Sequence, residues 1–259
     1  MRCLKLIFVL IVLLSINSCS HVDESERFIY VEPASVNRAV LIEDFTGQRC
    51  VNCPNASAEI ERLTEQYGEE NIVAVSIHSG PLAVYSQNQV NGLRTELGDM
   101  YYDHWKVEME PSALINRKSG VVLLNQWPAL VYDELKTLSS ISLGLAYQLT
   151  EIGELLITVH AEALEPVQGK LQLWLTEDGI VAPQMMPDGT MNSTYEHHHV
   201  LRAAVNGVWG DDVAWKLGEV SDIQYSIHPL KDWKVEHLAI VAFIYNDAGV
   251  LQVVRKPII

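Results

Sequence analysis

Short apolar runs alternate with amphipathic segments over residues 37–140, which is the pattern of an α/β domain. Residues 39–45 and 71–78 are β-branched apolar runs, and residues 55–67 between them have the spacing of an amphipathic helix. Two strands on either side of a helix are expected to run parallel, because a parallel pair needs a crossover connection. The sequence therefore predicts a parallel strand–helix–strand unit.

Further segments complete the predicted α/β domain. One helix is indicated by apolar residues that recur every four positions, at Leu93, Leu97, Tyr101 and Trp105. Residues 110–117 then form a strand introduced by Pro111. A short run at 121–124 and a helix at about 128–138 close the unit.

From residue 141 onward the pattern changes to strands without helices. The β-rich segments are separated by turn residues, which indicates a β-sandwich domain over residues 141–259. The expected strands cover residues 142–150, 154–163, 170–176, 198–205, 223–228, 238–245 and 250–256. Residues 179–195 are rich in Met, Pro, Gly and Asn, so we expect a long excursion between strands there, either a binding loop or a poorly ordered one.

The first 18 residues have the pattern of a bacterial lipoprotein signal peptide. Two basic residues precede the apolar run 6–14, which is too short to span a bilayer as a mature helix. The four residues ending at Cys19 resemble a lipobox, so we predict that Cys19 is acylated; the alternative is a plain cleaved signal with a free Cys19. Residues 19–36 are expected to be a tether between the lipid and the folded chain, since residues 20–27 are polar and acidic.

The charge balance excludes nucleic acid as a partner. The chain has 33 acidic and 18 basic side chains, a formal net charge of −15 at pH 7. Removing the signal peptide would take away two basic side chains and no acidic one. Nucleic-acid binding requires a basic surface. We expect instead a membrane partner, reached through the lipid on Cys19, and a location at the outer membrane that faces the periplasm or the cell surface.

Cys50 and Cys53 are the chemistry-bearing pair of the chain, because they are the only cysteines after residue 19. A Cys-x-x-Cys between a strand and a helix is typical of redox sites. The helix N-terminus and the positive charge of Arg49 favour a thiolate, so we predict that Cys50 is the nucleophile and Cys53 the resolving thiol. An inert structural disulfide is an alternative. A zinc site needs further ligands at matching positions, and the sequence shows none, so we predict no metal and no cofactor.

Histidines supply two weaker candidates. His78 ends the second strand, at the sheet edge where active sites gather, and could polarise a substrate thiol; a hydrogen-bonded structural histidine is the alternative. Along a strand only His197 and His199 of the triple histidine would share a face, and we expect a solvated strand end there rather than a metal site. Residues 211–212 are expected to form a turn, because alternating calcium ligands are missing.

Three elements of the N-terminal half together resemble the thioredoxin superfamily. They are Asp44 six residues before Cys50, the Cys-x-x-Cys that opens a helix, and Pro111 followed by a strand. The resemblance implies an α/β thioredoxin-like domain over residues 37–140. It also implies that Asp44 is a buried acid that helps to deprotonate the resolving thiol, and that Pro111 is cis and faces the disulfide.

The residues around these elements carry expectations of their own. Glu110 stands before the proline, where thioredoxins usually have an apolar residue. We expect Glu110, together with Arg49 and His78, to contact the substrate. No tryptophan precedes Cys50, and a proline follows the second cysteine instead of lying between the pair.

A longer resemblance covers nearly the whole mature chain. Residues 41–47, 50–54, 115–117 and 199–202 resemble the lipoproteins of the outer membrane protein twenty-eight family of Bacteroides-like bacteria. We therefore predict a cell-envelope lipoprotein with thiol–disulfide oxidoreductase activity, whose partners are protein thiols or disulfides. The alternative is a non-catalytic surface lipoprotein that uses a thioredoxin-like scaffold and a β-sandwich to bind a protein or a glycan. In the first case we expect the C-terminal half to add no catalytic group.

Overall fold

A computed structural model of the chain describes residues 37–87 and 91–259. The signal peptide, the tether and the acylated Cys19 were predicted for residues 1–36, which lie outside the described residues. Within the described ranges, no helix is both long and apolar enough to cross a membrane.

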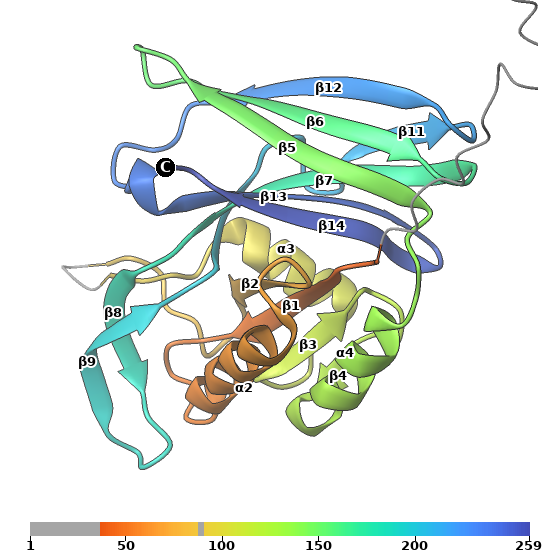
Figure 1. The fold of residues 1–259 in the computed structure, drawn as a ribbon. Coiled ribbons are helices and arrows are strands. Elements are labelled where there is room, and N and C mark those ends of the chain that lie inside the picture. Colours follow the sequence, from red (N-terminus) through yellow and green to blue (C-terminus); the bar gives the residue numbers. More distant parts are fainter. Residues whose placement is uncertain (1–36, 88–90) are drawn as a thin grey trace, which may run out of the picture. The chain divides into compact units, whose positions relative to one another are not determined.

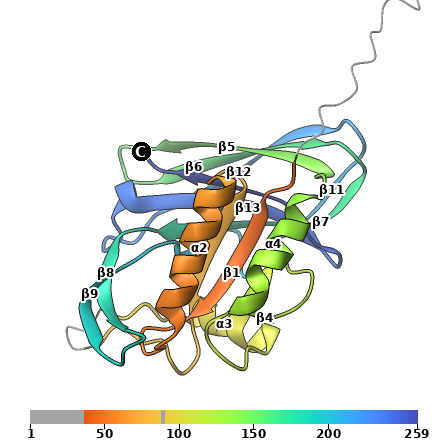
Figure 2. The same cartoon turned by 60° about the horizontal axis from the view of Figure 1, so that its bottom comes forward.

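The first part of the chain folds into a small sheet with helices on both faces (Figures 1 and 2). Its elements are β1 (Val40–Thr46), α2 (Cys53–Tyr67), β2 (Ile72–His78), α3 (Glu96–Trp105), β3 (Ser112–Ile115), β4 (Val122–Leu123), a 3-10 turn η2 (Leu124–Gln126) and α4 (Trp127–Leu135). Strand β1 pairs parallel with β2 and antiparallel with β3, which in turn pairs with β4. The predicted parallel strand–helix–strand unit is confirmed.

Alternation along β1 decides which side chains face which layer, because successive residues of a strand point to opposite faces. Val40 and Ile42 pack with α2 and α4, where Trp127 is fully buried. Leu41 and Phe45 pack on the other face, with residues of α3 and of the C-terminal half. Each face of β1 thus belongs to a different apolar core, and the strand is buried throughout.

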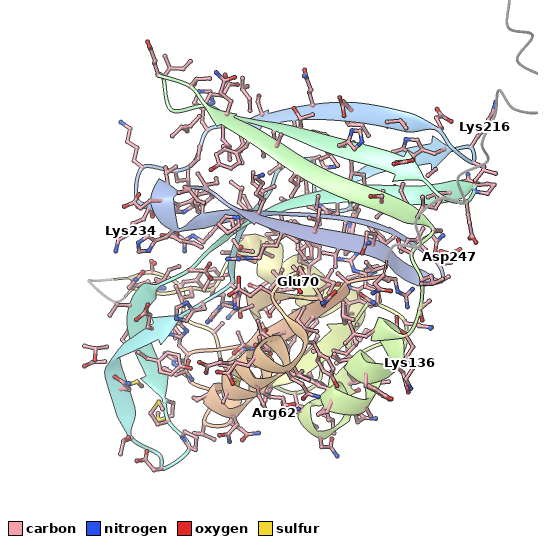
Figure 3. All side chains as sticks on the ribbon, viewed as in Figure 1. Arg62, Glu70, Lys136, Lys216, Lys234 and Asp247 are labelled. Carbon is pink, nitrogen blue, oxygen red and sulfur yellow. A yellow bond between two sulfur atoms is a disulfide. The ribbon has the colours of Figure 1, made fainter. Side chains whose placement is uncertain are left out.

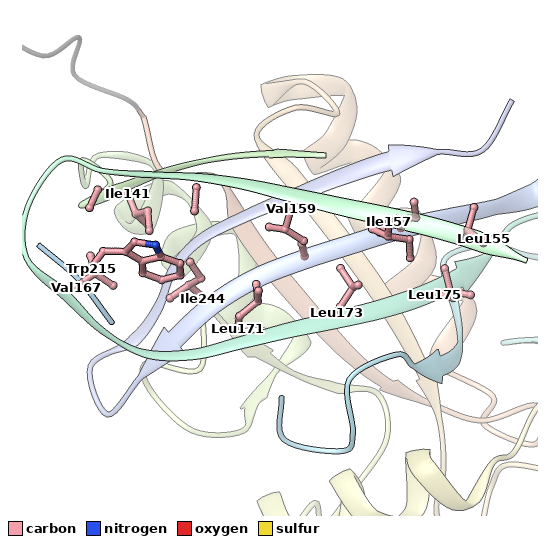
Figure 4. Packing of buried hydrophobic residues seen from close by; sticks show 14 of the residues in the cluster. Ile141, Leu155, Ile157, Val159, Val167, Leu171, Leu173, Leu175, Trp215 and Ile244 are labelled. Carbon is pink, nitrogen blue, oxygen red and sulfur yellow. The ribbon is translucent and has the colours of Figure 1, made fainter. Parts of the chain in front are cut away.

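The second part of the chain is built of strands. They are β5 (Ile141–Leu149), β6 (Leu155–Ala163), β7 (Val167–Glu177), β8 (Ile180–Met185), β9 (Met191–His197), β10 (Val200–Ala204), β11 (Asp211–Trp215), β12 (Val220–Ile227), β13 (Leu238–Asn246) and β14 (Gly249–Pro257), with a 3-10 turn η3 (Val235–His237). The sheet β12-β6-β5 packs on strands β7, β11, β13 and β14 through one apolar cluster (Figure 4). The predicted β-sandwich is confirmed.

Two local predictions in this half are wrong. Residues 179–195 do not form a long loop, because most of them belong to the antiparallel hairpin β8–β9. The inward positions of β8 are Ala182 and Gln184, which are small or polar, so the strand lacks the apolar alternation that would have revealed it. Residues 211–212 likewise begin strand β11 instead of forming a turn, because they pair with β7.

One nine-stranded sheet includes strands from both halves of the chain. Its order is β14-β13-β7-β10-β2-β1-β3-β4, with β11 also paired to β7. The junction is narrow: Val200 of β10 pairs with Ser76 of β2, and the Ser76 N–H donates to the carbonyl oxygen of His199 at 2.8 Å. The sheet therefore crosses the predicted boundary at residue 140. The division into two domains there stays a prediction.

A buried ion pair lies where the two halves meet. Arg117 donates from Nε to Oε1 of Glu43 at 2.6 Å and from Nη2 to Oε2 at 2.9 Å, and both side chains are almost completely buried. The guanidinium also lies over the rings of Phe243 and Tyr245, at 4.8 and 4.4 Å from their centroids. Two charges taken out of water need such close pairing. The ion pair lies within the first half of the chain, and the contacts of the guanidinium with Phe243 and Tyr245 connect it to the second half.

Candidate functional site

Cys50 and Cys53 form a disulfide at the start of α2, with their Cα atoms 5.4 Å apart. The helix begins at Cys53 and its N-cap is Asn52, so Cys50 lies before the helix and not at its first residue. The helix begins two residues before the predicted range 55–67, and its unpaired N–H groups lie closer to Cys53 than to Cys50 in the chain. The prediction that Cys50 is the nucleophile stays a prediction. Both cysteines are only 2% exposed. Neither sulfur is open to a large reactant in this arrangement.

Asp44 lies in the middle of the sheet, paired with Ser76 on one side and Ala113 on the other. It is 1% exposed, and its Oδ1 has no hydrogen-bond partner among the residues that the structure describes. Burial first, and then the neighbouring carboxylate of Glu110, raise the pKa of Asp44 to about 8. This carboxyl therefore carries a proton at neutral pH and can exchange it near pH 8.

Glu110 is the acidic group next to the disulfide. One of its carboxylate oxygens lies within 4.8 Å of both sulfur atoms. Burial is the main cause that raises the pKa of Glu110 to about 7. The Glu110–Pro111 peptide bond is cis, as the sequence comparison with thioredoxins predicts.

The hairpin β8–β9 closes the site from the C-terminal half. Gln184 donates from Nε2 to the carbonyl oxygen of Cys50 at 2.9 Å and is itself 2% exposed. The Met185 N–H donates to the carbonyl oxygen of Gln48 at 2.8 Å. In both Figure 1 and Figure 2 the hairpin lies beside α2. The C-terminal half thus supplies a wall of the cysteine site, which the sequence did not indicate.

A second segment, just after β2, contacts the loop that precedes Cys50. The Arg49 N–H donates to the carbonyl oxygen of Leu82 at 2.9 Å. Gly47 has to be a glycine, because a Cβ there would lie 2.5 Å from the carbonyl carbon of Leu82 and 2.7 Å from Oε2 of Glu110. The close approach at Gly47 brings the loop, this segment and Glu110 together.

Two buried histidines share a cavity with Cys53. The rings of His78, at the end of β2, and His197, at the end of β9, are 5.2 Å apart between centroids. With Cys53 they line a cavity of about 50 Å³. Burial lowers the pKa of His197 to about 4 and the pKa of His78 well below its usual value, and in each case a neighbouring histidine adds to the effect. Both rings are therefore neutral at pH 7.

The triple histidine does not form one solvated strand end. His197 is buried against His78, whereas His199 follows β9 in a left-handed conformation with φ 57°. The His199 N–H donates to Oδ1 of Asp178 at 2.7 Å. His197 and His199 therefore cannot share an ion in the way that a continuous strand would allow.

The predicted site residues fall into three groups. Cys50, Cys53 and Glu110 are brought together, and Asp44 is buried near enough to Glu110 for their charges to interact. His78 is buried and lines the cavity beside Cys53. Arg49 is exposed, and its role toward a substrate stays a prediction, as do those of the other residues.

Sequence reasoning missed Gln184 and did not place His197 in the site. Gln184 is 134 residues from the cysteine whose carbonyl oxygen it contacts, and it is a single polar residue in the strand Ile180–Met185. The signal for such a contact would be that every second side chain of β8, including Gln184, points inward. A hydrophobicity pattern does not show this, because Gln184 is polar.

A comparison of the sequence with protein-family profiles shows which family the chain belongs to. The profile of the family described as outer membrane protein Omp28 matches residues 98–259. The chain belongs to the Omp28 family. Membership confirms the family resemblance seen in the sequence and the location at the outer membrane. The matched region begins after Cys53, so it does not include the cysteine pair, and acylation of Cys19 stays a prediction.

Comparison with solved structures supports the fold of this Omp28 family member. HBP35 of Porphyromonas gingivalis matches with a TM-score of 0.67 and 14% identity, over 86% of this chain and 76% of that chain. At that identity the likeness is one of fold alone. A domain of the outer membrane lipoprotein Omp28 from Porphyromonas gingivalis matches with a TM-score of 0.33 and 26% identity, over 46% of this chain and 88% of that domain. A comparison with curated proteins found no match.

Proposed function

We propose that this outer membrane lipoprotein exchanges disulfide bonds with thiols of partner proteins through Cys50 and Cys53, in a thioredoxin-like domain of residues 37–140. The observation that carries the proposal is the buried carboxyl of Asp44, which is 1% exposed and whose Oδ1 has no hydrogen-bond partner among the residues that the structure describes. Burial raises the pKa of this carboxyl to about 8. Proton transfer at a thiol works best when the pKa of the donor lies near the working pH. A purely structural disulfide needs no such group.

The exchange is a two-step transfer of one electron pair. A partner thiolate attacks the sulfur of Cys50, the Cys50–Cys53 bond breaks, and Cys53 leaves as a thiolate that takes the proton of Asp44. The second thiol of the partner, losing its proton to solvent, then attacks the mixed disulfide and releases Cys50 as a thiolate. The partner becomes a disulfide and this chain a dithiol. In the reverse direction Asp44 accepts the proton of Cys53.

Access to Cys50 in this proposal requires the hairpin β8–β9 to move. The hairpin contacts the backbone at Cys50 and Gln48, and both cysteines are covered. A partner that displaces the hairpin would reach Cys50. The lipid on Cys19 would hold the domain at the membrane. The acidic net charge of the chain argues against nucleic acid as a partner.

A second candidate is a non-catalytic surface lipoprotein in which the Cys50–Cys53 bond is structural. The burial of both cysteines and the hydrogen bond from Gln184 to the carbonyl oxygen of Cys50 favour it, since a structural disulfide needs no access. The comparisons also lie closer to this candidate, because the family and the Porphyromonas Omp28 domain are described as outer membrane proteins and not as oxidoreductases. Here the α/β part is a scaffold, and the β-sandwich binds a protein or a glycan.

The reduction potential of the Cys50–Cys53 pair separates the two candidates. The purified protein is equilibrated with dithiol buffers of stepped potential, and the reduced fraction is counted by alkylation and mass spectrometry. Structural disulfides have potentials below about −300 mV, whereas exchanging ones lie higher. A value above that limit supports exchange, and a value below it supports the structural role.

A trapping experiment gives an independent result. In the variant Cys53→Ser, the Cys50 thiolate can attack a disulfide of a partner protein, and the second partner sulfur leaves as a thiol, but no Cys53 is present to resolve the mixed disulfide. This variant should therefore accumulate covalent complexes with disulfide-bearing proteins, and excess thiol should reduce these complexes again. The matched variant Cys50→Ser should not accumulate them. Equal trapping by the two variants would remove the assignment of Cys50 as the attacking thiol.

A further inference from the structure

Three metal-ligating groups meet at the cysteine site. The sulfurs of Cys50 and Cys53 and one carboxylate oxygen of Glu110 all lie within 4.8 Å of one another. They come from the start of α2 and from the residue before Pro111, which are separated by 57 positions in the chain. The sequence argument against a metal rested on the lack of further ligands, and the fold supplies one.

The carboxylate of Glu110 is held at the sulfurs without a partner of its own. Both of its oxygens are buried, and neither makes a hydrogen bond to any residue in the described ranges. They lie against Gly47 and Gly80, where a Cβ would come within 2.7 and 3.0 Å of them. A buried carboxylate without a partner is costly and uncommon. An unpaired buried carboxylate beside two sulfur atoms therefore indicates a ligand or a chemical role at this place.

We propose that the reduced Cys50–Cys53 pair and Glu110 form a binding site for a thiophilic divalent cation of the Zn²⁺ type. Two thiolates and one carboxylate suit such an ion, because Zn²⁺ accepts both sulfur and oxygen ligands and takes four in all. Three protein ligands leave the fourth position to water. The disulfide form offers no thiolate, so the site exists only in the dithiol state.

Formation of the site is balanced in electrons and protons. An external dithiol gives two electrons and two protons to the Cys50–Cys53 bond and becomes a disulfide itself. The cation then displaces the two thiol protons, and also the proton of Glu110 where that carboxyl is protonated. Zinc–sulfur bonds of about 2.3 Å require the two sulfurs to separate once their bond is broken. Binding therefore competes with reoxidation of the pair.

This inference goes beyond thiol exchange, because metal binding needs the dithiol but no transfer to a partner protein. If the ion binds and the protein traps no partner, the cation site stands and exchange does not. If exchange occurs and no ion binds, the exchange proposal stands and the cation site does not. The two proposals thus fail separately.

The test is a metal titration of the reduced protein. The protein is reduced with a phosphine, desalted without oxygen, and titrated with Zn²⁺ in competition with a chromogenic chelator. We expect one ion per chain in the reduced protein, none in the oxidised protein and none in Cys50→Ser. Glu110→Gln should weaken binding by roughly 10- to 100-fold or more, since even groups that only support a ligand have effects of that size.

A matched control separates the role of Glu110 from a loss of negative charge. Glu108 is exposed and two residues away, so Glu108→Gln should bind Zn²⁺ as the unchanged protein does. Equal affinity in Glu110→Gln and Glu108→Gln would overturn the assignment of Glu110. Cadmium NMR of the unchanged protein reads the ligands directly, so the test does not depend on folding of a variant. A signal typical of two sulfurs with oxygen supports the site, and a signal without sulfur contradicts it.

Discussion

The side-chain amide of Gln184 donates a hydrogen bond of 2.9 Å to the carbonyl oxygen of Cys50. The same nitrogen also lies 3.4 Å from the carbonyl oxygen of Gly47, and this oxygen is a second acceptor for the amide. One side chain of the β-rich half thus ties down the loop that carries the first cysteine. Opening of the hairpin β8–β9 is therefore coupled to exposure of the disulfide, whichever role the disulfide has.

Replacing Gln184 should make the disulfide easier to reduce. A hydrogen bond of this kind contributes about 0.5–1.5 kcal/mol, so Gln184→Ala should raise the population of the open hairpin, and the rate of reduction by a small dithiol, by roughly 2- to 10-fold. The rate is measured by quenched alkylation. Thr194→Ala is the control, because Thr194 is exposed on the same hairpin and its hydroxyl donates to the side chain of Asn192 on the same strand. Equal rates in the two variants would show that the hairpin does not limit access.

Removing the buried acid should flatten the pH dependence of stability. The pKa of Asp44 is raised from 3.8 to about 8 in the folded protein, so the folded state holds a proton that the unfolded state loses between these values. The stability that this group contributes is complete below about pH 4 and is lost as the pH rises through about 8. Glu110 acts in the same direction.

Asp44→Asn should therefore lose less stability than the unchanged protein between about pH 5 and about pH 9, with a difference on the order of a few kcal/mol. Thermal midpoints of the oxidised proteins at the two pH values measure it. The control is Asp133→Asn, which changes an exposed acid on α4. A full pH dependence in Asp44→Asn would mean that another group causes it.

Breaking the buried ion pair should be strongly destabilising. Arg117→Met leaves the carboxylate of Glu43 buried and unpaired, which costs about 3–5 kcal/mol. The double variant Glu43→Leu/Arg117→Met removes both charges and should recover most of that loss. Denaturant unfolding gives the free energies.

An exposed pair on α2 is the matched control for the buried one. Arg62 lies on the outer side of α2 (Figure 3) and pairs with Glu59 at 2.6 Å. Arg62→Met should change the free energy of unfolding by less than about 1 kcal/mol, because exposed pairs contribute little. A similar cost at both sites would contradict the special role of Arg117 at the junction of the halves.

Acid should loosen the hairpin through His197. Burial is the main cause that lowers the pKa of His197 from 6.5 to about 4 in the folded protein, and His198 adds to the lowering. Arg202 adds to the lowering of the pKa of His78. The unfolded state therefore binds more protons in this window, and the stability present above about pH 6.5 is lost as the pH falls toward about 4.

The disulfide should then be reduced faster at about pH 5 than at about pH 7.5, after correction for the pH dependence of the reductant on a small disulfide. His197→Gln should lose part of this acceleration, and the part that remains is caused by protonation of His78. His160→Gln is the control, because His160 is half-exposed and lies on β6, outside the hairpin β8–β9. An identical acceleration in both variants would exclude His197 as a cause.

The sequence by itself determined most of the local elements and the position of the cysteine pair between a strand and a helix. Strands β1 and β2 and helix α2 follow from periodicity, because each pattern of burial repeats within a few residues. The strands of the β-sandwich follow for the same reason. Asp44 and Pro111 were found through their spacing from the cysteines in the thioredoxin resemblance.

Only the tertiary structure decided what surrounds the disulfide. Glu110 meets the sulfurs, Gln184 covers Cys50 and His197 packs on His78. These contacts join residues that are distant in the chain, and the side chains are polar, so no hydrophobic period marks them. The same holds for Glu43 and Arg117, whose pairing depends on how the sheet brings β1 and β3 together. Periodicity reports which face of an element is buried; the partner on that face is decided by packing.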